Sequence, residues 1–569
     1  MTASPASLGW IVSANASATL VSRATAEGRA SSKLKPVINN RHVTAFISIS
    51  TLWRLAYLDG DRHINGAYLA QYRQRIASLV KEYTTMSKQL ESVDVLIIGA
   101  GLSGIGSACQ LRRNCPDRTF AIFESRTNIG GTWDLFRYPG VRSDSDMYTF
   151  SYGFKPWRDA SSVADGAKIR RYIQETAAEY DVTRHIHYQH KVVSAHWSSA
   201  HKHWTVTALA GESGEHITLT CQFIMSCSGY YDYDEGYTPD FAGTDQFHGP
   251  IVHPQHWPEN LDYRDKRVVV IGSGATAITL VPTMARETAS LIMLQRSPTY
   301  IADIPLEDPM ATRLRKWLPV AWASRLTRWK KVLYQIYVYR LSRKRPRVLR
   351  HFLLSEVRKQ LGPDYDVKTH FTPNYNPWDQ RLCAVPDGDL FDAIREGRAK
   401  VVTDHIDRFN REGIQLKSGQ QLDADIVIMA TGLNLKFAGG VEYQVDNKKL
   451  DFTDRFIFRG MMFSDLPNMA FTVGYTNSSW TLKADLTASY VCRLLNKMAK
   501  RGYSTVTPRM IGSVEEEPLL DFSAGYVLRS QDQFPKQGDR LPWKNYQNYI
   551  KDFITLRLGG LKDKELEFR

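Results

Sequence analysis

Cysteine is scarce in this sequence of 569 residues, and its spacing carries no redox or metal signature. The six cysteines form no Cys-x-x-Cys pair and no spacing that is typical of metal ligands. This pattern argues against a disulfide framework and fits a reducing compartment. Long apolar runs are missing too. The best, at residues 46–58, is short and is interrupted by Ser50, Thr51 and Arg54, so we expect no transmembrane helix.

Acidic residues are outnumbered, because 73 lysines and arginines stand against 59 aspartates and glutamates and give a formal net charge of +14. Such an excess of positive charge indicates an anionic partner, and the candidates are a nucleotide cofactor, a membrane surface and nucleic acid. The hydrophobic content of 43% and the charged content of 23% are those of a soluble globular protein. The length predicts two or more domains.

Most of the basic excess lies in one segment. Between residues 312 and 361, fifteen lysines and arginines accompany a single acid, Glu356. The segment also has apolar residues at helical spacing, namely Leu326, Trp329, Leu333, Ile336, Tyr337 and Leu341. We expect a helix that packs this stripe on its domain and leaves the charges in water. A membrane-surface helix is the open alternative, whereas nucleic acid is not expected because no binding motif accompanies the charge.

The first of two glycine turns follows an apolar strand at residues 93–98. It reads Gly99-Ala100-Gly101-Leu102-Ser103-Gly104 and opens a helix that we expect to reach Arg113. A strand at 120–123 then ends in Glu124, at about the separation at which an acid meets the ribose hydroxyls of a dinucleotide. The complete pattern predicts a dinucleotide-binding unit, and an acid there favours FAD, which has no 2′-phosphate. Without a Cys-x-x-Cys pair, a flavin disulfide reductase is not expected.

The second turn follows a strand at 267–271 and reads Gly272-Ser273-Gly274-Ala275-Thr276-Ala277. The first glycine permits the tight turn, Gly274 lets backbone amides approach a pyrophosphate, and Ala277 lets helix and strand pack closely. After the next strand, at 291–294, Arg296 stands where an NAD site has an acid. A guanidinium matches a phosphate in a bidentate manner, so this site is predicted to bind NADPH. A structural turn and a solvated arginine are the alternatives.

Five residues at fixed offsets lie just before the second turn: Phe247, Gly249, His253, Trp257 and Pro258. They resemble the fingerprint Phe-x-Gly-x-x-x-His-x-x-x-Trp-Pro of Baeyer-Villiger monooxygenases. In that family the segment connects two domains, and its histidine couples nucleotide binding to domain movement without acting as a base. The resemblance implies this role for His253, whereas in isolation it would be a polar residue of a linker.

Two further segments extend the resemblance on the flavin side. The loop Gly130-Gly131-Thr132-Trp133 is similar to one that contacts the flavin in class B flavoprotein monooxygenases, where paired glycines let the backbone come close. The turn Thr431-Gly432 after a strand at 426–429 is similar to the return of the chain to the FAD domain.

The resemblance also implies a catalytic pair. In the family, an aspartate at the position of Asp144 lies close to the flavin and to an active-site arginine, which corresponds here to Arg381 in the segment 376–391. A structural salt bridge is the alternative for Arg381. Two departures are Ser143, where cysteine is usual, and Gln380, where relatives often have a lysine that contacts the 2′-phosphate.

The sequence thus resembles class B flavoprotein monooxygenases, closest to the ethionamide-activating and long-chain-alkane-degradation enzymes. The resemblance implies an α/β fold with two dinucleotide-binding (Rossmann-like) domains and a helical insertion. We expect an FAD domain at 86–245 and 425–569, and an NADPH domain at 246–424 with a basic helical insert at about 306–370. The implied activity is NADPH-dependent insertion of an oxygen atom of O2 into lipophilic or long-chain ketones. Oxygenation of sulfur or nitrogen, alkane-pathway hydroxylation and a non-catalytic dinucleotide sensor are the alternatives.

Residues 1–85 differ from the rest, because they are rich in small and hydroxylated residues at first and have almost no acids before Asp59. A transit peptide has this composition. The alternative is an extension upstream of a true start at Met86, which we favour because the family resembled begins near there. We therefore expect a cytoplasmic protein, with peripheral membrane contact left open.

Overall fold

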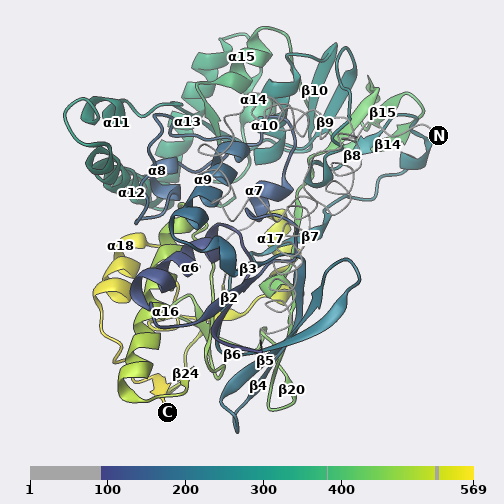
Figure 1. Ribbon diagram of the computed structural model, residues 1–569. Coiled ribbons are helices and arrows are strands. Elements are labelled where there is room, and N and C mark those ends of the chain that lie inside the picture. The colour runs from purple at the N-terminus through teal and green to yellow at the C-terminus, as the bar shows by residue number, and fades with distance from the viewer. Residues whose placement is uncertain (1–90, 381, 520–523) are drawn as a thin grey trace, which may run out of the picture. The chain divides into compact units, whose positions relative to one another are not determined.

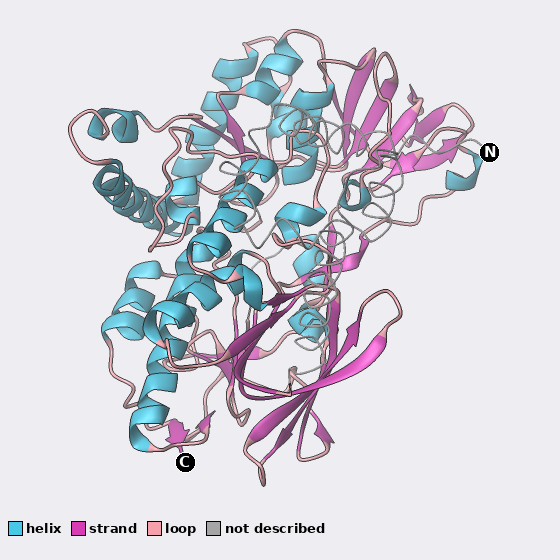
Figure 2. Cartoon of the chain, viewed as in Figure 1, coloured by secondary structure: helices cyan, strands magenta, loops and turns pink. Residues whose placement is uncertain are grey.

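The computed structural model describes residues 91–380, 382–519 and 524–569 (Figure 1). Both the expected extension at 1–85 and Arg381 lie outside the described residues. The described chain is mixed α/β, with strands gathered in two main sheets and helices on their faces (Figure 2). The expected fold class is therefore present in outline.

The first sheet has nine strands in the order β20-β19-β4-β5-β6-β1-β2-β3, with β23 pairing β6. Strands β1, β2, β3, β6 and β23 run parallel, whereas β4 and β5 add an antiparallel meander. The strand bounds are β1 Ser92–Ile98, β2 Phe120–Phe123, β3 Ile186–His187, β4 His190–Ser198, β5 His203–Ala210, β6 Glu215–Ser226, β19 Glu442–Val445, β20 Lys448–Lys449 and β23 Met469–Phe471. The strands expected at 93–98 and 120–123 are confirmed to within one residue.

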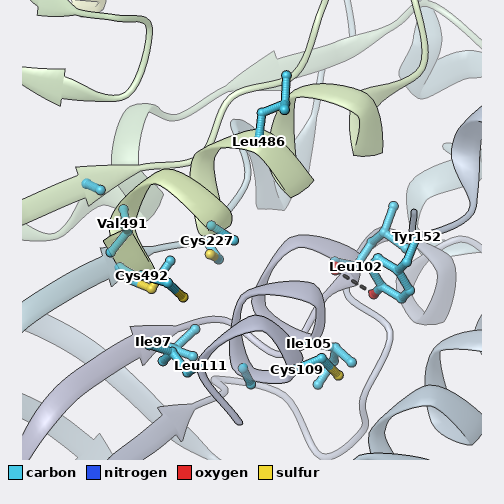
Figure 3. Packing of buried hydrophobic residues seen from close by; sticks show 14 of the residues in the cluster. Ile97, Leu102, Ile105, Cys109, Leu111, Tyr152, Cys227, Leu486, Val491 and Cys492 are labelled. Carbon is cyan, nitrogen blue, oxygen red and sulfur yellow. Dashed lines mark hydrogen bonds between the residues drawn. The ribbon is translucent and has the colours of Figure 1, made fainter. Parts of the chain in front are cut away.

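Helix α6 (Leu102–Asn114) occupies the centre of the core on one face of this sheet. It is buried over its first ten residues and lies between β1 and α16 (Trp480–Arg501), as Figure 3 shows with Ile97, Ile105 and Val491. The Tyr152 hydroxyl donates a hydrogen bond of 2.6 Å to the backbone oxygen of Leu102 and so fixes the first turn of α6 (Figure 3). The start of α6 is therefore held from several sides.

The second sheet is parallel, in the order β13-β10-β9-β17-β8. Its elements are β8 Ile251–Val252, β9 Arg267–Ile271, β10 Ser290–Gln295, β13 Lys400–Thr403 and β17 Ile426–Met429, with the helices α10 Ala275–Met284 and α15 Asp389–Arg395. Because β17 pairs both β9 and β8, the chain leaves this sheet only after Met429, a few residues later than the expected boundary before residue 425.

The remaining elements connect or cover these sheets. They are α7 Thr132–Leu135, α8 Met147–Phe150, α9 Gly166–Glu179, β7 Tyr231–Gly236, β11 Tyr300–Ile304, β12 Leu382–Pro386, β14 Ile406–Asn410, β15 Gly413–Leu416, β16 Gln421–Asp423, β18 Leu433–Leu435, β21 Ile457–Phe458, β22 Met462–Phe463, β24 Val506–Pro508, β25 Glu516–Pro518, α17 Gly525–Leu528, β26 Lys536–Gly538, α18 Tyr549–Asp552, a π-helix Phe553–Leu558 and β27 Leu566–Phe568. Strand β7 pairs with β18 and so joins the segment before the fingerprint to the segment after β17.

The basic segment forms α11 (Pro309–Leu314), α12 (Val320–Lys344), α13 (Pro346–Leu361) and α14 (Val367–Phe371). The expected packing of its apolar stripe holds only in part, because Ile336 and Leu341 are half-buried and the other four residues are exposed. On α12, Leu326, Trp329, Leu333 and Tyr337 are exposed, whereas the buried residues are Ala323, Ser324, Thr327, Val332 and Ser342.

Helix α12 is attached largely through polar contacts, while from its stripe Ile336 packs on a buried cluster and Trp329 meets the rings of Tyr549 and Phe553. The Lys331 Nζ lies 2.9 Å from carboxylate oxygens of both Asp146 and Asp308. Arg328 donates to the backbone oxygens of Tyr148 and Ser151 at 3.0 and 2.7 Å. These acceptors lie outside the segment, so a charge count over 312–361 could not reveal them. Within the described residues, no helix is both long and apolar enough to cross a membrane.

Candidate functional site

The first glycine turn is enclosed by backbone and by a buried acid. A Cβ on Gly104 would lie 1.8 Å from the backbone oxygen of Gly99, so α6 packs directly on the turn. The two carboxylate oxygens of Glu124 accept hydrogen bonds from the N–H of Ala100 at 2.7 Å and of Arg126 at 2.9 Å. Burial raises the pKa of Glu124, while these N–H groups act against the rise. The carboxylate therefore ties the end of β2 to the turn and keeps lone pairs for a further donor.

The paired-glycine loop lies against this turn. Gly131 has a φ of 57°, and a Cβ there would be 3.0 Å from the Cα of Gly101. The Thr132 hydroxyl lies 2.9 Å from the hydroxyl of Tyr233, and the Trp133 ring meets Phe150 edge-on. Gly131 thus lies against the first glycine turn, with Thr132 and Trp133 directly after it, and the contact of these three residues with the flavin stays a prediction.

The second glycine turn is open in front of its helix. Gly272 has a φ of 137°, and a Cβ there would lie 2.3 Å from the backbone oxygen of Ala430. Around Gly274, by contrast, a Cβ would meet no described atom within 4 Å. Ala277 is fully buried against the sheet. Space is therefore left at the start of α10, where backbone N–H groups of a helix favour an anion.

The strand register locates the residues that follow β10. Phe123 is level with Ile98, and Leu294 is level with Ile271, so Gln295 takes the place of Glu124. Gln295 is buried, and its amide donates to the backbone oxygen of His370 at 2.7 Å and to Thr403 Oγ1 at 2.9 Å. Arg296 comes one residue later and is exposed.

The fingerprint histidine touches the turn after β17. His253 Nε2 lies 3.0 Å from the backbone oxygen of Gly432, and Nδ1 accepts from the N–H of Gln255 at 3.2 Å. This pair of contacts assigns the proton to Nε2. Burial lowers the pKa of His253, so the ring is neutral near pH 7. A Cβ on Gly236 would lie 2.0 Å from the ring, which shows how closely β7 covers it.

A family model described as FMO-like, flavin-binding monooxygenase-like, matches residues 92–451. The chain belongs to this family. The resemblance inferred from the sequence motifs is confirmed at that level, and with it the expectation of a flavoprotein monooxygenase.

Two relatives are similar over nearly their whole length. The FAD-containing monooxygenase EthA of Mycobacterium tuberculosis (strain ATCC 25618 / H37Rv) is 54% identical over 480 residues, which cover 84% of this chain and 98% of that protein. The probable FAD-binding monooxygenase AlmA of Acinetobacter baylyi (strain ATCC 33305 / BD413 / ADP1) is 50% identical over 479 residues, with 84% and 96% covered.

Solved structures share the fold at low sequence identity. Oxidized steroid monooxygenase bound to NADP has a TM-score of 0.61 and 22% identity, covering 73% of this chain and 88% of that one. The open crystal structure of cyclohexanone monooxygenase has a TM-score of 0.64 and 17% identity, covering 84% and 100%. The expected α/β fold with two dinucleotide-binding units is thereby confirmed.

The catalytic pair expected in this flavin-binding monooxygenase-like chain is described only in part, because Arg381 lies outside the described residues. Asp144 is half-buried in a fixed loop, where Ser143 donates its N–H to the oxygen of Ala164 at 3.0 Å. Arg142 in the same loop forms a bidentate pair with Asp389 of α15, at 2.5 and 3.2 Å. The loop thus contacts the second unit, and the pairing of Asp144 with Arg381 stays a prediction.

Trp480 is a contact that the sequence reasoning missed. Its Nε1 donates to Ser103 Oγ at 2.8 Å, inside the first glycine turn, and its ring stacks on Tyr230 with centroids 5.2 Å apart. Trp480 is the first residue of α16 and lies far from the first turn in the sequence. The available signal was a tryptophan in the first turn of that helix, together with the tyrosine-rich segment 230–233 after β6.

Proposed function

We propose that this chain is an FAD- and NADPH-dependent monooxygenase that inserts one oxygen atom of O2 into a ketone to give an ester. The first unit would hold FAD and the second NADPH. The observation that carries the proposal is the contact between His253 of the Baeyer-Villiger fingerprint and Gly432, because it joins the connector to the second site at the edge of β17. The names of EthA and of the steroid monooxygenase support the two cofactors.

The residues present fit two dinucleotides. Helices α6 and α10 both begin at a glycine N-cap, Gly101 and Gly274, that makes no side-chain capping bond, and neither has an acid in its first turn. Their first N–H groups can therefore serve a phosphate, and the helix dipole favours the negative charge. Glu124 would accept from the ribose hydroxyls of FAD, whereas Arg296 would donate to the 2′-phosphate of NADPH.

The chain's own residues would position and stabilise, because bound FAD supplies the activation of O2. The guanidinium of Arg381 would provide a cation that stays charged and donates no proton to an anion beside it. Asp144 would hold that cation in place. His253, neutral and bonded to Gly432, would link occupation of the second unit to the connector. None of these roles requires a metal ion.

The test is product formation by the purified, FAD-loaded chain. We expect NADPH consumption to yield esters from 2-ketones, with long-chain ketones preferred over cyclohexanone, measured by gas chromatography with mass detection. Sulfoxides from sulfides or thioamides without any ester would favour the sulfur-oxygenating alternative, and alcohols from alkanes the hydroxylase. A chain that binds both cofactors and consumes no NADPH with any substrate would be a sensor.

A lipophilic substrate is supported by the outer face of α12. Trp322, Leu326, Trp329, Leu333 and Tyr337 recur every three or four residues and so share one face. Trp322 is 57% exposed and Tyr337 62%, and the preceding Trp317 is 86% exposed. An apolar face of this extent on a soluble protein marks an interaction site.

The occupant that we propose for this face is an anionic membrane surface. Among the described residues, Arg325, Arg340 and Lys344 have no ion-pair partner, and all three are exposed on α12. Aromatic rings beside unpaired cations are the composition of a helix that lies in the plane of a bilayer surface. Long-chain ketones partition into that same layer, so contact would bring enzyme and substrate together.

Vesicle sedimentation tests this contact. The parent should sediment with vesicles that contain phosphatidylglycerol, less so at high salt, and a triple variant with Trp322, Leu326 and Leu333 each changed to Ser should remain in solution. Ile511→Ser, which changes another exposed aliphatic residue, is the matched control. Sedimentation of the triple variant like the parent would exclude this face, and turnover of a short, soluble ketone should be equal in all three proteins.

A further inference from the structure

An arginine from near the end of the chain stacks on Tyr237, which is bonded to the turn after β17. Arg529 follows α17, and its guanidinium carbon lies 3.4 Å from the centre of the Tyr237 ring. Its Nη1 lies against Gly525, 3.4 Å from the position that a Cβ would take there. The guanidinium is therefore stacked on an aromatic face although the residue is exposed, and the stacking limits its freedom before any ligand binds.

Tyr237 is itself fixed to the edge of the second sheet. Its backbone N–H donates to the backbone oxygen of Gly432 at 3.1 Å, and its backbone oxygen accepts from Thr431 Oγ1 at 2.6 Å. Gly432 is also the residue that His253 contacts. The ring under Arg529 thus belongs to the same cluster of turns as the fingerprint histidine.

The carboxyl ends of β17, β9 and β10 are neighbours at this edge, since β9 pairs with both other strands. Gly272 follows β9 and Arg296 follows β10, and Ser273 Oγ donates to the oxygen of Ser297 at 3.0 Å. Burial lowers the pKa of Arg529, and the charge of Arg296 lowers it further. No acid of the described ranges forms an ion pair with either arginine. The two arginines therefore repel each other electrostatically, and no ion pair with an acid among the described residues offsets this repulsion.

We propose that Arg529 and Arg296 together bind a phosphate group of the dinucleotide in the second unit. The proposal rests on the NADPH site proposed above and adds to it a residue from the C-terminal part of the chain. An anion that contacts both guanidinium groups relieves their repulsion, and the stacked Arg529 loses little freedom when it binds. Arg529 would also supply the second cationic contact to the phosphate, which the neutral side chain of Gln380 cannot make. The 2′-phosphate and the pyrophosphate present the same chemistry, and the choice of nucleotide separates them.

The experiment is calorimetric titration of the FAD-loaded protein with NADP+ and with NAD+, without substrate, so that turnover plays no part. Arg529→Ala should weaken NADP+ binding by about tenfold to a hundredfold, the effect of losing a charge-assisted hydrogen bond. Loss for NADP+ alone identifies the 2′-phosphate, and an equal loss for both nucleotides identifies the pyrophosphate. Arg411→Ala, at an exposed arginine that has no ion pair within the described ranges, is the matched control and should bind both like the parent.

A second variant separates stacking from charge. Tyr237→Leu keeps both arginines and removes the ring, so NADP+ binding should weaken by less than in Arg529→Ala. Unchanged affinities for both nucleotides in Arg529→Ala would overturn the proposal while leaving the NADPH site intact. A parent that binds neither nucleotide would refute the NADPH site itself. The flavin absorbance of each variant should match the parent, because Arg529 has no contact with the first glycine turn.

Discussion

The two glycine turns of this chain follow the same backbone path and end in different surroundings. In each, the first glycine donates its N–H to the second strand, from Gly99 to Phe123 and from Gly272 to Leu294, at 2.8 Å in both cases. Helix α6 then packs so tightly that Gly104 has no room for a methyl group, whereas α10 has Ala277 at the same place. The first turn is closed by its own backbone, and the second leaves space.

The charged residues that follow the second strand of each unit, Glu124 and Arg296, also differ in how enclosed they are. Glu124 is buried and holds the first turn through the N–H of Ala100, whereas Arg296 is exposed and has no ion pair within the described residues. Trp480 adds a further contact to the first turn through Ser103. An enclosed unit is expected to keep its dinucleotide through many turnovers, and an open one to exchange it in each cycle. We therefore expect the two sites, which share one sequence pattern, to exchange their dinucleotides at different rates.

The largest expected effect comes from removing the packing difference. Gly104→Ala would place a Cβ 1.8 Å from the oxygen of Gly99, so the turn must move. We expect the free energy of unfolding to fall by about 3 kcal/mol and FAD to be lost, as seen in thermal unfolding and flavin absorbance. The matched change Ala277→Gly should cost about 1 kcal/mol and keep NADP+ binding. Equal tolerance of both changes would show that the two turns do not differ in packing.

A second expected effect concerns the arginine that lies in the sequence of the second unit and is predicted to act at the first. Arg381→Ala should keep FAD bound and NADPH oxidised, while ester formation falls by at least about a hundredfold, the scale of one preorganised electrostatic contact. Ester and hydrogen peroxide per NADPH consumed are the quantities to measure. Arg398→Ala, at another arginine of the same unit, should behave like the parent. If Arg381→Ala still couples NADPH oxidation to ester formation, Arg381 is a structural residue.

The third prediction tests the exposed charge of the second unit. Arg296→Ala should weaken NADPH binding by about tenfold to a hundredfold and leave NADH unchanged, since a charge-assisted phosphate contact is lost. The NADPH to NADH ratio of kcat/KM reports the change, and Arg408→Ala is the control at a nearby exposed arginine. An unaltered ratio would show that Arg296 does not contact the 2′-phosphate.

The strands and turns of both units could be predicted because each lies in one continuous stretch with a distinct pattern. The position of α12 could not, since its inner face is held by Asp146, Asp308 and backbone oxygens outside the segment. The place of Gln295 depends on strand register, which a motif does not fix. Trp480 contacts the first turn and Arg529 stacks on Tyr237, and only tertiary packing brings them there from distant parts of the chain.

The smallest expected effect tests the link between the two units. Neutral His253 accepts from Gln255 at Nδ1 and donates to Gly432 from Nε2. Protonation turns Nδ1 into a donor that faces an N–H, so the link weakens. Because burial lowers the pKa of His253 from its usual 6.5, although the bond to Gly432 acts in the opposite direction, the stability that the neutral ring contributes at this site is fully present above pH 6.5 and is lost as the pH falls through the lower folded-state pKa.

We therefore expect NADP+ affinity to drop by about threefold to tenfold as the pH falls from 6.5 through the lower folded-state pKa of His253, the scale of one net hydrogen bond. His253→Gln, which cannot titrate, should lack this pH dependence. The exposed His248 is not among the groups that shift the pKa of His253, so His248→Gln should keep the profile of the parent and serves as the control. Flavin absorbance should stay constant across the same pH range, because the first unit does not depend on the histidine. If the drop persists in His253→Gln, another group carries the pH dependence and the histidine only fills space between β7 and the turn after β17.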